Sequence, residues 1–472
     1  MLSYTFDKNS KTPLYEQLYQ QIKDDIVSKK LPAYRPLPSK RALAEHFSIS
    51  VITIENAYNQ LLSEGYIFSV PRKGYYVNEV IEQSPAGLNA DLISSRHTFQ
   101  QLKEETAKQE KQNESYFADF TSNATDPATF PFATWAKIHR KLLSQEQSLL
   151  MTNSPSNGIS ELRNAITEYL REFRGINTSP DNIVVGAGTE TIYPILIQLL
   201  GYDKVYATED PGYEKIYLTL LSNNVDTVKI PLDIYGIRLG EIDKYGVDVV
   251  HVTPSHHFPT GITMPINRRH QLLNWAYSKE SIHNARYIIE DDYDSEFRLS
   301  GLPIPSLFSI DENERVIYTN TFTKSLASTI RISYMVLPDH LMNEYFEKFS
   351  FYSCPVSTFE QLTLARFISE GYYEKHINRM RTSSKKKRDI LLKTIKSGPL
   401  ADLSEIREEQ SGLHFLIKLN ISKSDEELIQ LCEEKRIKIA AVSPHSFMVN
   451  YSSIPLERIE KAVNTIASLI DN

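Results

Sequence analysis

Residues 287–297 read YIIEDDYDSEF, an apolar run that ends in a series of carboxylates. Residues 316–325 read VIYTNTFTKS, a second apolar run that is followed by a lysine, Lys324. Carboxylates directly after an apolar strand are costly to bury unless they meet a cation. We therefore expect residues 287–289 and 316–319 to be buried strands whose ends place Lys324 in the same region as these carboxylates.

The same pattern continues on both sides of these two stretches. From about Phe117 onward, short apolar runs alternate with longer segments of helical spacing, and we interpret four more of the runs as buried strands: residues 183–185, 204–207, 227–230 and 249–252. Such alternation predicts an α/β fold, a mostly parallel sheet covered by helices on both faces. Ligands of such sheets bind at the carboxyl ends of the strands.

Three of these predicted strands lead into residues that suit ligand binding. Residues 185–191, VGAGTET, close a strand and open a helix, so their N–H groups could hold a phosphate. Residues 209–213, EDPGY, present Tyr213 at the next strand end, and residues 253–261, TPSHHFPTG, follow another strand. Each feature alone has an ordinary structural explanation, since a surface tyrosine usually packs and a lone lysine is usually solvated. Their predicted convergence at one edge of the sheet is what favours a function.

One cofactor, pyridoxal 5'-phosphate (PLP), requires all of these groups. It needs an amine for a Schiff base, a carboxylate at its pyridinium nitrogen, a hydroxyl at its phenolic oxygen, an aromatic ring for stacking, and phosphate ligands. The residues that we assign to these roles are, in the same order, Lys324, Asp291, Tyr293, Tyr213, and the group of Gly188, Thr189, Ser325 and Arg331. We also count His257 among the cofactor-binding residues, and we predict no metal site.

The first 78 residues are organised differently. Residues 13–29 and 37–47 have apolar side chains at helical spacing, and a short turn at residues 48–50 leads into a third helical segment that Ser50 can cap. Two short helices joined by a tight turn can present the second helix to the major groove of DNA. The pattern favours a small helix-turn-helix domain.

A predicted β-hairpin over residues 66–77 follows these helices, and its tip carries Arg72 and Lys73. Adjacent cations at such a tip are well placed to contact DNA phosphates. Residues 1–80 contain ten Lys/Arg and eight Asp/Glu, a net charge of +2, so the other 392 residues carry −9 of the total −7. A mildly basic head on an acidic body fits local contact with DNA better than a uniformly basic coat would.

The remaining composition is that of an ordinary globular protein. The two cysteines, Cys354 and Cys432, cannot form a disulfide framework, and the first residues carry charges where a signal peptide needs an apolar core. No apolar run approaches the roughly 18 residues of a membrane span. We expect a cytoplasmic protein without membrane association.

The head resembles the GntR-type winged helix. The resemblance rests on LPSKRALAEHFSIS at residues 37–50, TIENAYNQLLSEGYI at residues 53–67 and KGYYV at residues 73–77. It implies that Ser39 and Arg41 contact the DNA backbone and that Ser50, Thr53 and Asn56 face the groove. It also implies that Arg72 contacts DNA from the wing, to which we add Lys73. One position departs, because Val51 stands where this family commonly has an arginine. The operator sequence therefore cannot be taken from relatives, and we expect fewer base contacts than usual.

The whole chain is similar to the MocR subgroup of GntR regulators, whose body resembles the fold-type I aminotransferases. The stretches that carry this resemblance are EDPGY, TPSHHFPTGITMP, IIEDDYDSEF and NTFTKSLASTIRISYMV. The resemblance implies a transcription regulator with PLP held on Lys324, as a dimer in which each head is exchanged to the partner's body. The expected divisions are residues 1–78 for the winged helix, 79–116 for a linker, and 117–472 for the PLP-binding domain, with a large part at about 150–340 and a small part at about 350–472.

Two positions depart from the enzymes that the body resembles. Phe258 stands where true aminotransferases have an asparagine on the PLP oxygen, and Met448 stands where we would look for the arginine that clamps the substrate carboxylate. No arginine occurs between Arg436 and Arg458. Lys215 offers a weaker contact to a carboxylate, although a surface lysine is the more common explanation.

These departures separate two hypotheses. In the first, the body is a sensor whose effector is PLP itself, an amine, or an amino acid held differently, and the protein is not an enzyme. In the second, it is a working aminotransferase with an appended DNA-binding module. Turnover of amino acids requires orientation and proton transfer together, so the missing clamp favours the sensor.

Overall fold

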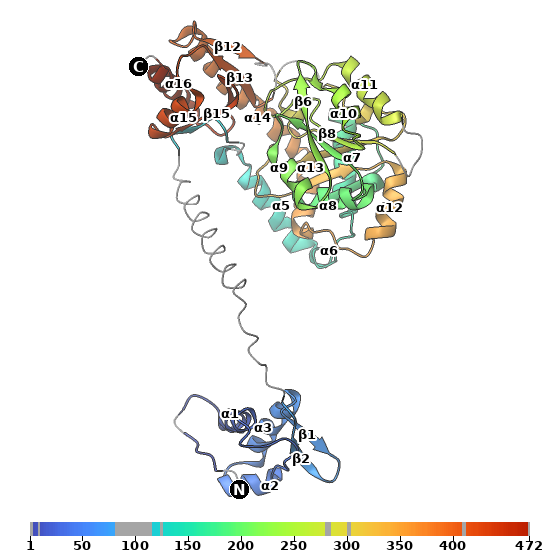
Figure 1. Ribbon diagram of the computed structural model, residues 1–472, viewed down its shortest axis with the longest axis vertical. Coiled ribbons are helices and arrows are strands. Elements are labelled where there is room, and N and C mark those ends of the chain that lie inside the picture. The colour runs from blue at the N-terminus through green and yellow to red at the C-terminus, as the bar shows by residue number, and fades with distance from the viewer. Residues whose placement is uncertain are drawn as a thin grey trace. The chain divides into compact units, whose positions relative to one another are not determined.

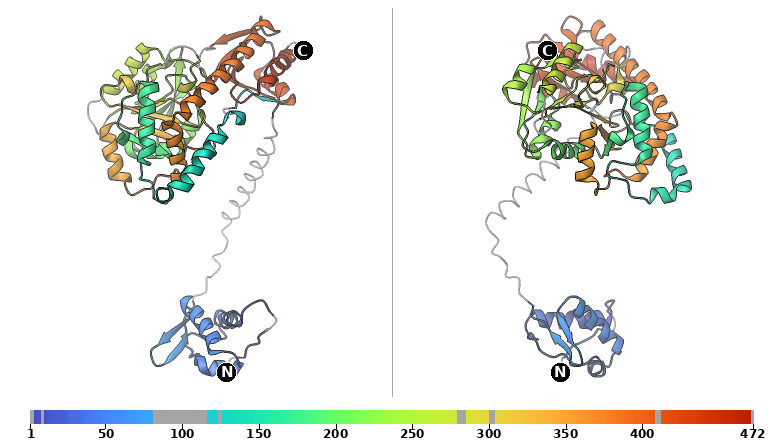
Figure 2. Two further views of the ribbon diagram at one scale, coloured as in Figure 1. Left: turned by 180° about the vertical axis from the view of Figure 1, so that it is seen from behind. Right: turned by 90° about the vertical axis from the view of Figure 1, so that its right-hand side faces the viewer.

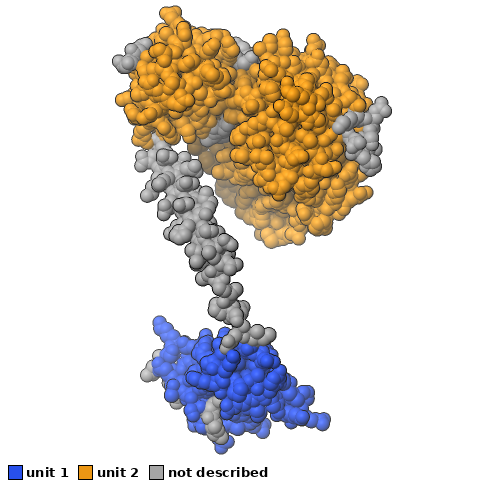
Figure 3. All heavy atoms as spheres, viewed as in Figure 1, with its two compact units in different colours: residues 1–113 blue, residues 114–472 orange. Residues whose placement is uncertain are grey.

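The computed structural model describes residues 3–7, 10–80, 116–122, 126–278, 285–299, 304–407 and 412–470. Residues 81–115, most of the predicted linker, lie outside these ranges. The chain divides into two compact units, residues 1–113 and 114–472, which we call the head and the body (Figure 3). Among the described residues, no helix combines the length and apolar character needed to cross a bilayer.

The described part of the head contains three helices and a hairpin, as the sequence predicts (Figure 1). Their bounds are α1 (Leu14–Val27), α2 (Lys40–Phe47), α3 (Val51–Ser63), β1 (Ile67–Val70) and β2 (Gly74–Val77). The second helix begins three residues later than the pattern suggests. Leu37 is instead extended and donates its N–H to the carbonyl of Tyr75 at 2.8 Å, which joins this segment to the wing. Apolar residues spaced three and four apart on the three helices meet in one core.

The body is built on an eight-stranded sheet in the order β4-β11-β10-β9-β8-β5-β6-β7. Its strands are β4 (Ile183–Gly186), β5 (Tyr206–Asp210), β6 (Thr227–Asp233), β7 (Gly236–Ile237), β8 (Val249–Val252), β9 (Tyr287–Asp291), β10 (Val316–Thr321) and β11 (Ser333–Val336). The central strands β6, β5, β8, β9 and β10 are parallel. The predicted mostly parallel sheet is therefore confirmed.

Two strands of this sheet were not predicted, the two-residue β7 and strand β11. Strand β11 lies between β4 and β10 and is antiparallel to both. It is only four residues long, and its short apolar run is not separated by a helix from the strand before it. The loop between β10 and β11 contains both Lys324 and Arg331, so this strand brings the two residues back to the same edge of the sheet.

Strands β5 and β9 extend past the apolar pattern at their carboxyl ends, and each extension contains a buried glutamate. Glu209 in β5 accepts hydrogen bonds from the backbone N–H and the hydroxyl of Thr253 at 3.0 and 3.1 Å. Glu290 in β9 accepts hydrogen bonds from two backbone N–H groups, those of Leu307 and Phe308, at 2.8 and 2.9 Å. Hydrogen bonds of this kind offset the cost of burying a charged group.

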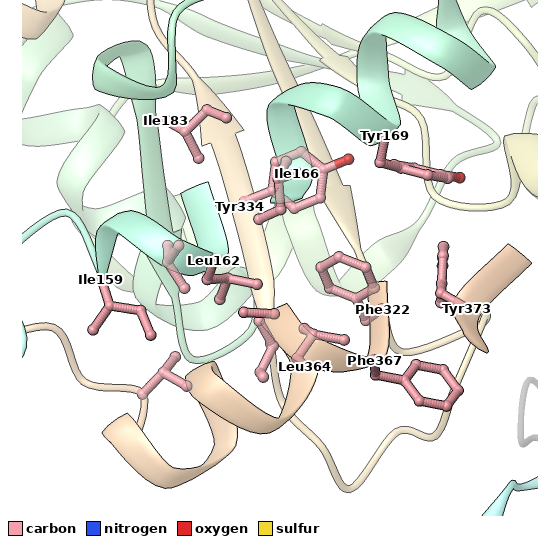
Figure 4. Close-up of a cluster of buried hydrophobic side chains, with 14 of the residues drawn as sticks. Ile159, Leu162, Ile166, Tyr169, Ile183, Phe322, Tyr334, Leu364, Phe367 and Tyr373 are labelled. Atoms are coloured by element: carbon pink, nitrogen blue, oxygen red, sulfur yellow. The ribbon is translucent and has the colours of Figure 1, made fainter. Parts of the chain in front are cut away.

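Helices cover both faces of the large sheet (Figures 1 and 2). Adjacent residues on one strand contribute to two separate cores, since Val185 and Tyr318 belong to one and Val184 and Ile317 to the other. Figure 4 shows part of the first core, where Tyr334 and Phe322 lie near the helical side chain of Tyr373. The helices of this region are α5 (Phe132–Gln145), α6 (Gln147–Leu150), α7 (Ser160–Tyr169), α8 (Thr189–Leu200), α9 (Glu214–Ser222), α10 (Leu239–Lys244), α11 (Ile266–Tyr277), α12 (Asp339–Phe349) and α13 (Thr358–Ser369).

A second, antiparallel sheet in the order β12-β13-β16-β15 forms the C-terminal part of the body. Its elements are α14 (Tyr372–Ser397), β12 (Ser404–Arg407), β13 (His414–Leu419), α15 (Asp425–Glu434), β14 (Ile437–Lys438), β15 (Ala440–Ser443), β16 (Ser446–Asn450) and α16 (Leu456–Ile470). The start of the body joins this part, because β3 (Ala118–Asp119) pairs with β14 and Phe120 lies in the same core. The small part therefore includes residues from both ends of the body.

Candidate functional site

A cavity of about 330 Å³ lies at the carboxyl ends of the parallel strands, next to Lys324. It is lined by Gly188, Thr189, Tyr213, Lys215, Thr253, Phe258, Asp291, Tyr293, Thr321, Thr323, Lys324, Ser328 and Arg331. This position is the one that sheets of this type use for ligands.

Seven of the residues predicted from the sequence meet in this cavity: Gly188, Thr189, Tyr213, Asp291, Tyr293, Lys324 and Arg331. They come from four segments that are distant in the sequence. The parallel register of β5, β9 and β10 aligns the ends of three of these segments, and the turn into α8 completes the wall. The tertiary structure thus brings together groups that sequence spacing could only suggest.

Two predicted residues are not in the cavity lining. The Ser325 side chain is fully buried, and its carbonyl accepts a hydrogen bond from His376 Nε2 at 2.7 Å. His257 is buried beside Glu209, with 3.3 Å between His257 Nε2 and the carboxylate oxygen. In each case a chain neighbour, Lys324 or Phe258, takes the place at the cavity wall.

Sequence reasoning missed two hydroxyls that stand before the lysine. Thr321 and Thr323 line the cavity, and their Oγ1 atoms lie 2.7 Å apart. The backbone N–H of Thr323 also donates to Thr321 Oγ1 at 3.1 Å, which holds the turn. The available signal was their alternation with the buried Phe322, which places both threonines on the side opposite to the core.

The Lys324 amine loses its proton more readily than an ordinary lysine amine. Burial lowers the pKa of this amine to about 8, although the negative charges of Asp294 and Asp291 act in the opposite direction. An ordinary lysine is almost entirely protonated at neutral pH, whereas this one has an appreciable deprotonated fraction. A deprotonated amine is the form that attacks a carbonyl carbon.

Asp291 and Tyr293 stand on the β9 side of the cavity. Asp291 is buried, and its carboxylate lies 3.7 Å from His251 Nε2. Burial, followed by the charges of Asp294 and Asp291, raises the pKa of the Tyr293 phenol well above its usual value. The phenol therefore stays protonated and can donate a hydrogen bond to an oxygen placed in the cavity.

The turn before α8 forms the part of the cavity best suited to a phosphate. Gly188 adopts a φ of 89°, a backbone conformation that favours glycine, and the guanidinium of Arg331 lies next to it. Helix α8 begins at the next residue, Thr189, and its N-terminal N–H groups favour an anion. The guanidinium of Arg331 and the ammonium of Lys215 both pair with Glu190 at this edge.

Aromatic rings complete the walls. The ring of Tyr213 stands almost perpendicular to that of Phe258, with centroids 5.7 Å apart. Met448, by contrast, lies in β16 and faces an apolar cavity within the small part of the body. Among the described lining residues of the Lys324 cavity, Arg331 is the one arginine.

One cluster outside the cavity has the residue types of a metal site. His256, Asp294 and His414 are buried, with one ligand atom of each within 4.8 Å of the others. A hydrogen bond of 2.7 Å between His256 Nδ1 and Asp294 already accounts for the closest contact. The neighbouring hollow is lined by Arg174 and Arg298, whose positive charges disfavour a cation.

The predicted DNA-contacting residues cluster around the two helices of the turn motif and the wing. Arg41, Asn56, Arg72 and Lys73 are exposed. The other predicted contacts stabilise helix starts: Ser39 caps α2 through the N–H of Ala42, and Ser50 caps α3 through the N–H of Thr53. The expected cap at Ser50 is thus confirmed.

Exposed apolar side chains begin α3. The relative exposure of Val51 is 43 % and that of Ile52 is 68 %, although both are large and apolar. Nearby, Lys40 bridges α2 and α3 through an ion pair of 2.6 Å with Glu55. The first turn of α3 therefore presents methyl groups where a polar surface would be usual.

Comparison with known proteins agrees with this geometry in both units. Residues 118–466 match the family "Aminotransferase class I and II", and residues 14–77 match "Bacterial regulatory proteins, gntR family". Among solved structures, an archaeal alanine:glyoxylate aminotransferase superposes with a TM-score of 0.68 at 23% identity, covering 78% of this chain and 94% of that chain. The fold and site define an aminotransferase-type body that carries a DNA-binding head.

Similar proteins of known sequence share both units. The HTH-type transcriptional regulator YdeL of Bacillus subtilis is 39% identical and covers 91% of this chain and 89% of its own length. The "probable rhizopine catabolism regulatory protein MocR" of Rhizobium meliloti is 28% identical, with coverages of 98% and 94%. The pyridoxine biosynthesis regulator PdxR of Corynebacterium glutamicum is 25% identical, with coverages of 88% and 85%. The chain belongs to the MocR subgroup of the GntR regulators.

Pyridoxal 5'-phosphate is the cofactor that membership of the aminotransferase class I and II family implies, and the cavity fits it. Lys324 offers the amine, Asp291 the carboxylate and Tyr293 the hydroxyl, at one cavity. The close approach at Gly188 leaves a cradle that a side chain would fill. Tyr213 provides an aromatic wall.

Proposed function

We propose that this regulator uses its aminotransferase-type body as a sensor rather than as an enzyme. PLP, alone or together with an amine or amino acid, would occupy the Lys324 cavity and change how the head binds DNA. Two features of the cavity support the proposal. Its lining offers each kind of group that PLP requires, and the one arginine among the described lining residues, Arg331, lies at the Gly188 turn. Such a cavity can hold the cofactor but lacks the bidentate clamp that orients an amino acid for turnover.

When bound, PLP would supply an aldehyde that condenses with primary amines. The residues of the chain would bind and orient it. Lys324 would provide the attacking amine, Asp291 would keep a proton on the pyridine nitrogen, and Tyr293 would donate to the phenolic oxygen. Thr321 and Thr323, together with the Gly188 turn and Arg331, would hold the phosphate. Ser325 and His257 are not needed for these roles.

For ligand binding in the body to change DNA binding by the head, the protein needs two conformational states that differ in their affinity for the ligand. A ligand shifts an equilibrium only as far as its differential affinity for the two states allows. We propose a head-to-tail homodimer as the unit that has these states, because regulators of this kind act on paired DNA half-sites. Closure of the small part of the body over the Lys324 cavity is the candidate motion.

The head would bind DNA with α3 in the major groove and the β1–β2 hairpin against the backbone. Arg41, Arg72 and Lys73 are exposed and suit phosphate contacts, whereas Asn56 suits a base edge. Val51 and Ile52 can contact the methyl group of thymine, which is the apolar feature of the major groove. The head would thus read DNA with fewer charged base contacts than an arginine at position 51 would allow.

The decisive experiment measures binding of the cofactor-free protein to the DNA upstream of its own gene. We expect PLP, alone or with an amine or amino acid, to change the affinity or the footprint. Lys324→Ala should remove this response but keep basal DNA binding. Lys348→Ala, at an exposed lysine that pairs with Glu344, should behave as the wild type. DNA binding that ignores PLP and all added amines would contradict the sensor.

The second candidate is a working aminotransferase, and the fold of the body is the observation that favours it. Steady release of a keto acid by the purified protein, abolished by Lys324→Ala, would establish turnover. We expect no steady release from α-amino acids. A half-reaction limited to one equivalent per site would still be consistent with sensing.

A further inference from the structure

Glu190 holds two cations at the edge of the Lys324 cavity. Its carboxylate pairs with the guanidinium of Arg331 and with the ammonium of Lys215, both of which line the cavity. Arg331 lies 141 residues away in the sequence, so the pair exists only through the fold. No step of the proposed cofactor chemistry uses this carboxylate.

The carboxylate reaches the turn that suits the cofactor phosphate. A Cβ added to Gly188 would lie 2.9 Å from Glu190 Oε2 as well as 2.4 Å from Arg331 Nη2. The carboxylate and the guanidinium therefore meet beside Gly188, at the turn into α8. An incoming phosphate needs the same guanidinium.

We propose that Glu190 is a built-in competitor of the cofactor phosphate, which must take Arg331 from this carboxylate in order to bind. The inference rests on the proposed function, because it assumes that PLP occupies the Lys324 cavity. Glu190 then lowers the affinity for PLP and raises the concentration at which the cavity fills. This makes occupancy respond to the supply of a phosphorylated aldehyde.

Two effects lower the affinity for PLP. The carboxylate of Glu190 repels the phosphate, and Arg331 must leave this carboxylate before it can pair with the phosphate. Part of Glu190 is buried, which disfavours its charge, but hydrogen bonds from Lys215 and Arg331 lower the pKa of its carboxyl to about 2. It is therefore ionised at every pH near neutrality and opposes a phosphate throughout that range. An apparent dissociation constant rises in proportion as the binding-competent arrangement becomes rarer.

The partly exposed position of the cluster makes such exchange feasible. The relative exposures of the side chains are 37% for Glu190, 45% for Arg331 and 47% for Lys215. Ion pairs at this exposure are weak and exchange readily, unlike a buried pair. Glu190 can release Arg331 and keep Lys215, so the loss of one partner does not leave its charge unpaired.

The test is a titration of the full-length, cofactor-free protein with PLP and, in parallel, with pyridoxal, which has no phosphate. Glu190→Gln keeps the shape of the side chain and removes its charge. We expect it to lower the dissociation constant for PLP about five- to tenfold, the size of one like charge at a partly exposed site. The constant for pyridoxal should be unchanged, and the PLP effect should shrink at high salt.

A matched control and a second variant complete the design. Glu344 is an equally exposed glutamate, at 38%, that pairs with Lys348 on α12 away from the described cavity lining. Glu344→Gln should leave both constants unchanged. Glu190→Ala should tighten PLP binding as Glu190→Gln does, and tryptophan fluorescence should confirm that each variant is folded.

The outcomes separate the two proposals. Unchanged or weaker PLP binding in folded Glu190 variants, with wild-type protein binding PLP through Lys324, would overturn the competitor role alone and make Glu190 a residue that positions Arg331. An equal gain for PLP and pyridoxal would also overturn it. If neither the wild type nor any variant binds PLP through Lys324, the proposed function itself fails.

Discussion

The head and the body place their functional charges in opposite environments. Arg41, Arg72 and Lys73 of the head are exposed on a helix and a hairpin tip. Asp291 and Asp292 of the body are buried at the end of a strand, where Asp292 pairs with the equally buried Arg174 at 2.8 Å. Exposed charges act through many small, salt-screened contributions, whereas a buried charge depends on the few groups that it contacts. Substitutions should therefore have graded effects in the head and severe ones in the body.

The largest effect is expected from breaking the buried pair. Arg174→Met leaves Asp292 buried without its cation, which should reduce the free energy of unfolding of the body by about 3–5 kcal/mol. Both tryptophans, Trp135 and Trp275, lie in the body, so urea unfolding followed by tryptophan fluorescence reports this unit alone.

The control for this experiment lies on the same helical turn. Arg171 is exposed and pairs with Glu168, so Arg171→Met should change stability by less than about 0.5 kcal/mol. DNA binding by the head should survive in both variants at low temperature. An equal decrease in the free energy of unfolding in Arg174→Met and Arg171→Met would show that burial of the ion pair does not determine the size of the effect.

A pH effect of up to about a hundredfold is expected at Lys324. Because the pKa of its amine is about 8, the reactive deprotonated fraction falls about tenfold per pH unit below that value and levels off above it. The rate at which the visible absorbance band forms on adding PLP should follow this curve, measured by stopped-flow absorbance. A rate that keeps rising to pH 10 would mean that the amine is not perturbed.

A smaller, uniform effect is expected in the head. Arg41→Ala should weaken binding to every DNA sequence by a similar factor, because the expected contact is to phosphate. The slope of log affinity against log salt should fall by about one. Fluorescence anisotropy with specific and scrambled duplexes would measure both quantities. Loss confined to one base pair would contradict the phosphate contact.

The smallest effect concerns the apolar start of α3. If Ile52 or Val51 contacts a thymine methyl, replacing that thymine by deoxyuridine should cost about 0.8 kcal/mol, the value of one buried methyl group. Ile52→Ala should weaken binding to the thymine duplex and reduce the difference between the two duplexes. A difference that persists in both Ile52→Ala and Val51→Ala would assign the methyl contact to another residue.

Much of the fold could be predicted from the sequence because the patterns that indicate it involve residues close together in the chain. The helical spacing in the head and the apolar strands of the body both report the side that each element buries. Strand β11 was not predicted because its three apolar residues, Tyr334, Met335 and Val336, follow no helix and carry no periodic signal. The late start of α2 escaped because Leu37 pairs with Tyr75 of the wing, a contact that sequence spacing does not record.

Some residues of the candidate site could likewise be predicted from the sequence, and others could not. Lys324, Asp291 and Tyr293 were accessible because polar groups at the ends of apolar strands are unusual for a physical reason, the cost of burying them. Ser325 was expected beside the cofactor and lies in the core, while Thr321 and Thr323 take the cavity side. The amino-acid composition of the loop does not show which of these side chains faces the cavity. The path of the loop in the folded protein decides it.

The sequence by itself determined the two kinds of domain, the order of most elements and most of the predicted residues that meet in the Lys324 cavity. These features follow from periodicity and from the chemistry of single side chains, which act over a few residues. The tertiary structure alone decided that Glu190 holds Arg331 and that the cavity has no second arginine among its described lining residues. Such pairings join segments more than a hundred residues apart, and their energies exist only once the sheet has aligned its strand ends.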